Sequence, residues 1–167
     1  MAIYVTSDAH GHVRALDEAL SKISLASDDT LYVLGDMIDR GPDPVGVIKL
    51  VRSLPNARVL KGNHEQIMLD AIIGQDPLDA ETWDINGGWT TRQQLNDMEF
   101  EAYEELVRWM ATLPLYAVAE TDERPYLLVH AGIQTEAARA FLLEHGVDCA
   151  DGAGAVDADR ELLKQML

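Results

Sequence analysis

Apolar residues in the first 75 positions alternate between two spacings. Short continuous apolar runs predict buried strands at Ala2–Thr6, Thr30–Leu34 and Ala57–Leu60. After each run, apolar residues recur at helical spacing, which predicts helices over Val13–Ile23, Pro44–Ser53 and Glu65–Ile73. This alternation of strand and helix favours an α/β fold with a largely parallel sheet and right-handed crossovers.

The second half of the chain continues with a different order of elements. The pattern predicts a helix over Glu99–Ala111 and then two strands, Leu115–Ala119 and Tyr126–His130. Two further helices are predicted over Thr135–His145 and Asp157–Leu167. Because no repeat, low-complexity tract or linker divides the chain, we expect a single domain over residues 1–167.

Composition limits the kinds of binding partner and the cellular compartment that we expect for the protein. The chain has 29 Asp and Glu against 13 Lys and Arg, a net charge of -16, so its surface repels nucleic acid. No basic, apolar signal peptide opens the sequence, and no run of about 18 apolar residues suits a membrane span. A single cysteine, Cys149, cannot form an internal disulfide. We therefore predict a cytoplasmic protein with no nucleic-acid or membrane partner.

Metal-binding side chains follow four of the predicted strands. The ends of these strands carry the following residues: Asp8, His10, Asp36, Asn63, His64 and His130. The carboxyl ends of parallel strands gather at one edge of a sheet, where ligands bind. A single Asp at a strand end is usually a turn or a helix cap, but caps do not require histidine at three of four ends.

This set of residue types suits a pair of divalent cations. Two metals about 3.5–4 Å apart can hold a phosphoryl group and generate hydroxide at neutral pH. Asp8 and His10 are two positions apart in an extended segment and can reach one ion, while Asp36 is the candidate for a shared ligand. Mixed oxygen and nitrogen ligands favour manganese, iron or zinc over calcium.

The blocks around these residues resemble a known family. Asp8–Gly11, Gly35–Gly41 and Gly62–Glu65 occur in the order of the calcineurin-like metallophosphoesterases, and Val129–Gly132 is similar to the fourth block of that family. Asn86–Thr90 resembles a segment of bacterial serine/threonine phosphatases. The chain is thus similar to the bacterial and phage serine/threonine protein phosphatase type.

The resemblance implies a fold and a reaction. The fold would be a four-layer αββα sandwich with two mixed sheets between helices. The reaction would be phosphoester hydrolysis, in which a metal-bound hydroxide attacks phosphorus in line without a phosphoenzyme. Two divalent ions would be needed, manganese first, with iron or zinc as alternatives. The substrate would be a phosphoprotein or a small phosphoester.

The resemblance also implies the metal ligands. Asp8 and His10 would bind the first ion, and Asp36 would bridge the two. Asn63 and His130 would bind the second ion.

Catalytic and phosphate-binding roles are implied for the neighbouring residues. His64 would protonate the leaving oxygen, Asp39 would orient that imidazole, and Arg40 would clamp the phosphoryl oxygens. Asn63 and Lys61 would also contact the phosphate. Lys61 stands where the family usually has arginine, so one bidentate contact would be lost.

Other residues receive structural roles. We expect Glu65 to support its loop rather than react, and Trp83, Trp89 and Trp109 to pack in the core or in a lid.

The chain departs from the family after the fourth block. No Gly-His pair, which would supply a further ligand to the second metal, follows His130. We therefore expect the second ion to bind more weakly than the first and the second sheet to be incomplete. An open sheet edge near Tyr126–His130 would then allow self-association.

Three functions remain open at this point. The first is a serine/threonine protein phosphatase, favoured by the Gly-Asn-His-Glu and Asp-Arg-Gly motifs. The second is symmetrical hydrolysis of dinucleoside tetraphosphates, a related activity of the same scaffold. The third is a truncated, inactive pseudo-phosphatase that acts as a binding protein.

Overall fold

The computed structural model describes residues 1–74, 76–122 and 125–132. The chain divides into two compact units, Met1–Pro114 and Leu115–Leu167. Among the described residues, no helix has both the length and the apolar character needed to cross a bilayer. The helices expected over Thr135–His145 and Asp157–Leu167 lie outside the described residues.

The first unit is built on a parallel sheet. Its strands are β1 (Ile3–Thr6), β2 (Thr30–Val33) and β3 (Ala57–Val59), in the order β1-β2-β3. Both pairings are parallel, with Tyr4 opposite Leu31 and Leu31 opposite Ala57. The predicted α/β class and parallel sheet are therefore confirmed.

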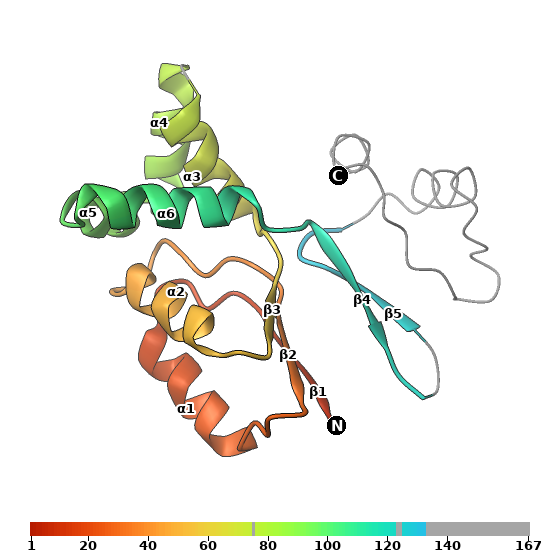
Figure 1. The fold of residues 1–167 in the computed structure, drawn as a ribbon. Coiled ribbons are helices and arrows are strands. Elements are labelled where there is room, and N and C mark those ends of the chain that lie inside the picture. The colour runs from red at the N-terminus through yellow and green to blue at the C-terminus, as the bar shows by residue number, and fades with distance from the viewer. Residues whose placement is uncertain (75, 123–124, 133–167) are drawn as a thin grey trace, which may run out of the picture. The chain divides into compact units, whose positions relative to one another are not determined.

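Two crossover helices connect these strands. They are α1 (Val13–Ile23) and α2 (Pro44–Ser53), with the bounds that the apolar spacing predicts. The side chain of Asp43 accepts a hydrogen bond from the Gly46 N–H at 2.9 Å and caps the start of α2, where Pro44 occupies the first turn. Figure 1 shows both helices on the same side of the sheet, as two crossovers of one hand require.

Four helices follow β3 in the first unit. They are α3 (Asn63–Ile73), α4 (Pro77–Ile85), α5 (Trp89–Asn96) and α6 (Phe100–Ala111). The helix expected from Glu65 begins two residues earlier, because Gly62 serves as its N-cap. The apolar pattern does not predict α4 and α5. The available signal for α4 is its cap, since the Asp76 side chain accepts a hydrogen bond from the Leu78 N–H at 2.9 Å.

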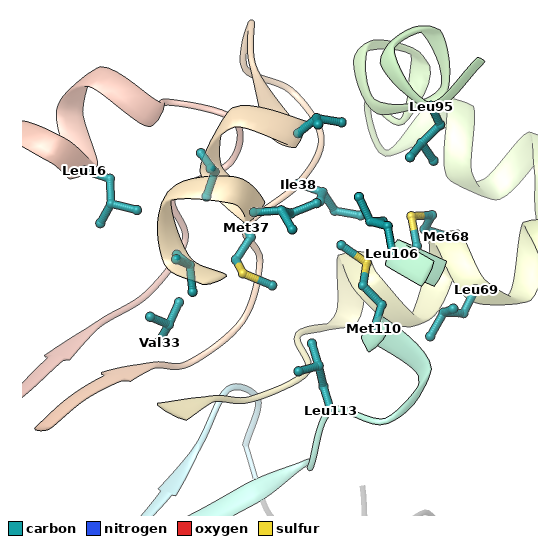
Figure 2. Packing of buried hydrophobic residues seen from close by; sticks show 14 of the residues in the cluster. Leu16, Val33, Met37, Ile38, Met68, Leu69, Leu95, Leu106, Met110 and Leu113 are labelled. Carbon is teal, nitrogen blue, oxygen red and sulfur yellow. The ribbon is translucent and has the colours of Figure 1, made fainter. Parts of the chain in front are cut away.

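The core of the first unit reaches into the loop after β2. Met37 and Ile38 are fully buried and lie within the cluster that α2, α3 and α6 contribute to (Figure 2). Asp36 and Asp39 stand on either side of this apolar pair. Burial of the two side chains therefore anchors the loop and fixes the positions of both carboxylates.

Gly35 allows the loops after β2 and β3 to approach each other. Its φ is +92°, and a Cβ on it would overlap the Gly62 backbone, with only 2.5 Å to the Gly62 Cα. We expect Gly35→Ala to lower the free energy of unfolding by about 2–5 kcal/mol, from left-handed strain and overpacking together. Urea unfolding measures the change, with Gly132→Ala as the control because a Cβ there meets no atom within 4 Å. A loss no larger than that of the control would contradict the close approach.

The described part of the second unit is an antiparallel pair. β4 (Tyr116–Glu120) and β5 (Pro125–Val129) pair with Tyr116 opposite Val129. The two predicted strands are confirmed, with both bounds of β4 one residue later and both bounds of β5 one residue earlier than expected. Within the described residues, the sheet β1-β2-β3 is wholly parallel and the sheet β4-β5 is wholly antiparallel, whereas two mixed sheets were expected. The four-layer arrangement stays a prediction.

Candidate active site

The loops after β1 and β2 are joined through their backbones. The N–H of Asp8 donates to the Gly35 carbonyl at 3.2 Å, and the N–H of His10 donates to the Asp36 carbonyl at 2.9 Å. A third bond, from Gly11 N–H to the Met37 carbonyl, measures 2.8 Å. These bonds hold the polar residues of both strand ends at one edge of the sheet.

Glu65 joins the loops after β2 and β3. Its buried carboxylate accepts the N–H groups of Asp36 and Met37, both at 2.8 Å, and of Gly62 at 2.7 Å. Burial raises the pKa of this carboxyl above its ordinary value, although the three N–H donors act in the opposite direction. The contacts agree with the expectation that Glu65 supports the loop.

Asp36 lies at the centre of the polar cluster. Its Oδ1 accepts the His64 backbone N–H at 3.0 Å, and its Oδ2 lies 3.6 Å from His10 Nε2 and 4.0 Å from His64 Nε2. Asp8 Oδ1 is 3.8 Å from the same His10 nitrogen. The structure therefore brings together the three residues predicted to bind the first metal.

His10 is oriented with one nitrogen facing the cluster. Its Nδ1 lies 2.9 Å from the Ile38 carbonyl, which can only accept, so Nδ1 carries the proton. Nε2 is then left as an acceptor and receives a hydrogen bond from Arg40 Nη1 at 2.9 Å. An outer hydrogen bond of this kind is how ligand histidines are usually held.

His64 and Asp39 form a buried pair. His64 Nδ1 lies 2.7 Å from Asp39 Oδ2, and neither side chain has measurable exposure. Nε2 of His64 accepts from Arg40 Nη2 at 2.8 Å. The rings of His10 and His64 meet edge to face with centroids 4.7 Å apart.

Arg40 places its guanidinium between the two imidazoles, while its backbone bonds elsewhere. Its N–H donates to the Gly87 carbonyl at 3.0 Å, which ties the loop after β2 to the turn before α5. The guanidinium donates to the Nε2 atoms of His10 and His64, and Arg40 as a whole residue is exposed. A planar, permanently charged donor in this place can bind phosphoryl oxygens.

Backbone strain is concentrated in these loops. Among the described residues six other than glycine have positive φ, and five of them belong to this cluster: Asp8 (56°), His10 (39°), Asp36 (52°), Asp39 (69°) and Arg40 (63°). Each such residue costs roughly 1–3 kcal/mol and persists only where its surroundings impose it. Strain of this density is typical of functional sites.

The cluster fits a metal ion. One ligand atom each from His10, Asp36 and His64 lie within 4.8 Å of one another. The two Nε2 atoms already face a cation, the Arg40 guanidinium. Two imidazoles and a carboxylate are donors that manganese, iron and zinc accept. The geometry also makes His64 Nε2 a possible ligand, a role that the sequence did not suggest.

The remaining predicted residues are placed as follows. Asn63 is exposed at the first position of α3, next to His64. Lys61 is buried, and its Nζ donates to Gln66 Oε1 at 3.2 Å. His130 follows β5 in the second unit. The metal and phosphate contacts of these three residues stay predictions.

Two residues that contact Asp39 were missed by sequence reasoning. Trp83 Nε1 lies 3.1 Å from both carboxylate oxygens, and Thr91 Oγ1 donates to Oδ1 at 2.6 Å. The sequence had placed Trp83 in the core or a lid and gave Thr91 no role. The motif Asn86–Thr90, which lies between them, was the available signal.

Comparison with known proteins identifies relatives of the chain. The family profile described as "Calcineurin-like phosphoesterase" matches residues 1–162. Symmetrical bis(5'-nucleosyl)-tetraphosphatases from Erwinia tasmaniensis and Salmonella paratyphi C are 32% and 30% identical to this chain in sequence. The alignments cover 80% and 93% of this chain but 45% and 50% of those proteins. The chain thus spans about half the length of the curated relatives it matches.

Solved structures give the same picture of the fold. A metallophosphoesterase from Sphaerobacter thermophilus is 28% identical, with a TM-score of 0.50 over 70% of this chain and 42% of its own. A serine/threonine protein phosphatase from Saccharomyces cerevisiae has a TM-score of 0.61 over 98% of this chain and 47% of its own. At 18% identity, that likeness concerns the fold alone.

Proposed function

This chain belongs to the calcineurin-like phosphoesterase family, and from that premise we propose that it is a metal-dependent hydrolase that cleaves dinucleoside tetraphosphates symmetrically. The observation that carries hydrolysis is the convergence of His10, Asp36, Arg40 and the His64–Asp39 pair at one edge of the sheet. The choice of substrate is supported by the two curated relatives, both named as symmetrical tetraphosphatases.

Metal binding is assigned to the residues that the sequence suggested. Asp8, His10 and Asp36 would hold one ion, and Asn63 and His130 would contribute to a second. When bound, such ions supply positive charge to a phosphoryl group and activate water. Manganese is our first candidate, with iron and zinc as alternatives.

The other side chains act on the substrate directly. Arg40 would exchange its bonds to the two imidazoles for bonds to phosphoryl oxygens and so orient the phosphorus. His64 Nε2 would hold a proton for the leaving oxygen, since its Nδ1 is engaged by Asp39. Burial of the pair excludes water from that proton.

The proposed reaction breaks one bond in the polyphosphate chain. A water molecule gives up a proton to solvent as its oxygen bonds to one of the two inner phosphorus atoms. The bond between that phosphorus and the oxygen that bridges to the other inner phosphorus breaks. The bridging oxygen leaves with the second nucleoside diphosphate, and His64 supplies its proton.

A protein phosphatase is the second candidate. The supporting observation is the segment Asn86–Thr90, which resembles one in bacterial serine/threonine phosphatases and whose Gly87 carbonyl accepts the Arg40 N–H. A phosphoprotein would then replace the dinucleotide at the same cluster.

The two candidates are separated by their products. We expect the chain with manganese to convert diadenosine tetraphosphate to ADP alone, with kcat/KM at least about tenfold above that for a phosphoserine peptide. ATP and AMP among the products would contradict symmetrical cleavage. A preference for the phosphopeptide would transfer the proposal to the protein phosphatase.

A further inference from the structure

Asp39 is held by more than its bond to His64. The buried carboxylate accepts hydrogen bonds at both oxygens. Oδ2 accepts from His64 and Trp83, and Oδ1 accepts from Thr91 and Trp83. Trp83 comes from α4 and Thr91 from α5, and the two residues are 44 and 52 positions from Asp39 in the chain. All four side chains are at most 2% exposed, so water does not compete for these bonds.

Thr91 fixes both the backbone and the side chain of Asp39. Its hydroxyl accepts the Asp39 N–H at 2.9 Å and donates to Asp39 Oδ1 at 2.6 Å. The φ of Asp39 is +69°, a conformation that needs such support in a residue other than glycine. The hydroxyl therefore stabilises the strained backbone and selects the side-chain rotamer together.

Trp83 is itself held in place. A Cβ on Gly88 would lie 2.6 Å from the indole Cγ, so the absence of a side chain at 88 lets the ring reach Asp39. The guanidinium of Arg92, a residue of α5, lies 4.9 Å from the centroid of the Trp83 ring and pairs with Asp84 at 2.7 Å. The segment between α4 and α5 thus serves to present one N–H to both oxygens of Asp39.

We propose that Trp83 and Thr91 are positioning residues that hold Asp39 in the orientation in which it fixes His64 for proton delivery to the leaving oxygen. This inference rests on the proposed function. Without either donor, the Asp39 carboxylate can turn from His64 Nδ1, and the imidazole loses its fixed direction. The consequence is specific, because a proton donor matters most when the leaving oxygen is strongly basic.

The first readout compares two leaving groups in the full chain. We expect Thr91→Val to lower kcat for phenyl phosphate by about ten- to hundredfold. For p-nitrophenyl phosphate, whose leaving group needs less protonation, we expect a loss of less than about threefold. Thr91→Ser keeps the hydroxyl and should restore most of the phenyl phosphate rate. Trp83→Phe, which removes the indole N–H together with part of the buried ring, should repeat the selective loss and provides a second variant if Thr91→Val does not fold.

The second readout does not depend on activity. In the wild type, the His64 Nδ1–H bonded to Asp39 should give a low-field proton resonance, absent in Asp39→Asn. We expect Thr91→Val and Trp83→Phe to shift or abolish that resonance. Thr91→Ser should keep it, as should Thr112→Val, whose hydroxyl donates to the Trp109 carbonyl on the surface.

Equal losses on both substrates, or an unchanged resonance in both variants, would overturn the positioning role. If the wild type hydrolyses neither monoester, the resonance alone decides the inference. The proposed function fails only if diadenosine tetraphosphate is not hydrolysed either.

Discussion

Replacing Asp36 with asparagine is expected to lower kcat/KM for any phosphoester substrate by at least about a thousandfold. Asp36 Oδ2 faces the Nε2 atoms of His10 and His64, and the substitution replaces a charged oxygen with a neutral group that would hold a cation far more weakly. Asparagine can still accept the His64 backbone N–H, so the loop should keep its conformation. Manganese titration of the variant should show a parallel loss of affinity.

The control for this variant is an exposed aspartate on α1. Asp17→Asn makes the same chemical change at an exposed position of α1 outside the cluster and should leave both turnover and manganese affinity unchanged. If Asp36→Asn folds and retains more than about a tenth of the wild-type kcat/KM, Asp36 does not hold the ions as proposed.

Replacing Glu65 with glutamine is expected to lower the free energy of unfolding by about 2–4 kcal/mol. Three buried N–H groups converge on the two carboxylate oxygens, and glutamine has only one oxygen to offer. Its amide nitrogen would face at least one backbone donor, which leaves both groups unpaired in the interior. Asp36 and Gly62 would then lose a shared anchor.

Urea unfolding followed by circular dichroism measures this loss. Glu81→Gln, at an exposed position of α4, is the matched control and should change stability by less than about 0.5 kcal/mol. A Glu65→Gln protein as stable as this control would show that the three N–H bonds do not hold the loops together.

The spacing of apolar residues was sufficient to predict a helix where the buried residues follow the helical repeat. The predicted bounds of α1 and α2 agree with the structure, because both helices bury one apolar stripe against the sheet. The polar residues at the ends of β1, β2 and β3 were found for a related reason. Parallel strands place their carboxyl ends together, so Asp8, Asp36 and His64 could be expected at one edge.

Helix α5 shows what periodicity cannot reveal. Its sequence from Trp89 to Asn96 has few apolar residues, and two of the three residues it buries are Thr90 and Thr91. The contact between Thr91 and Asp39 joins positions 52 residues apart through a hydroxyl, which carries no apolar signal. Positive φ at Asp39 and Arg40 likewise follows from tertiary contacts rather than from residue type.

The central claim is hydrolysis that depends on metal bound at this cluster. The most direct test is p-nitrophenyl phosphate hydrolysis by the chelator-treated chain as manganese is added back. The expected result is no measurable turnover without metal and a saturable rise with manganese. Turnover that persists in chelator, or a folded protein that binds manganese and remains inactive, would contradict it.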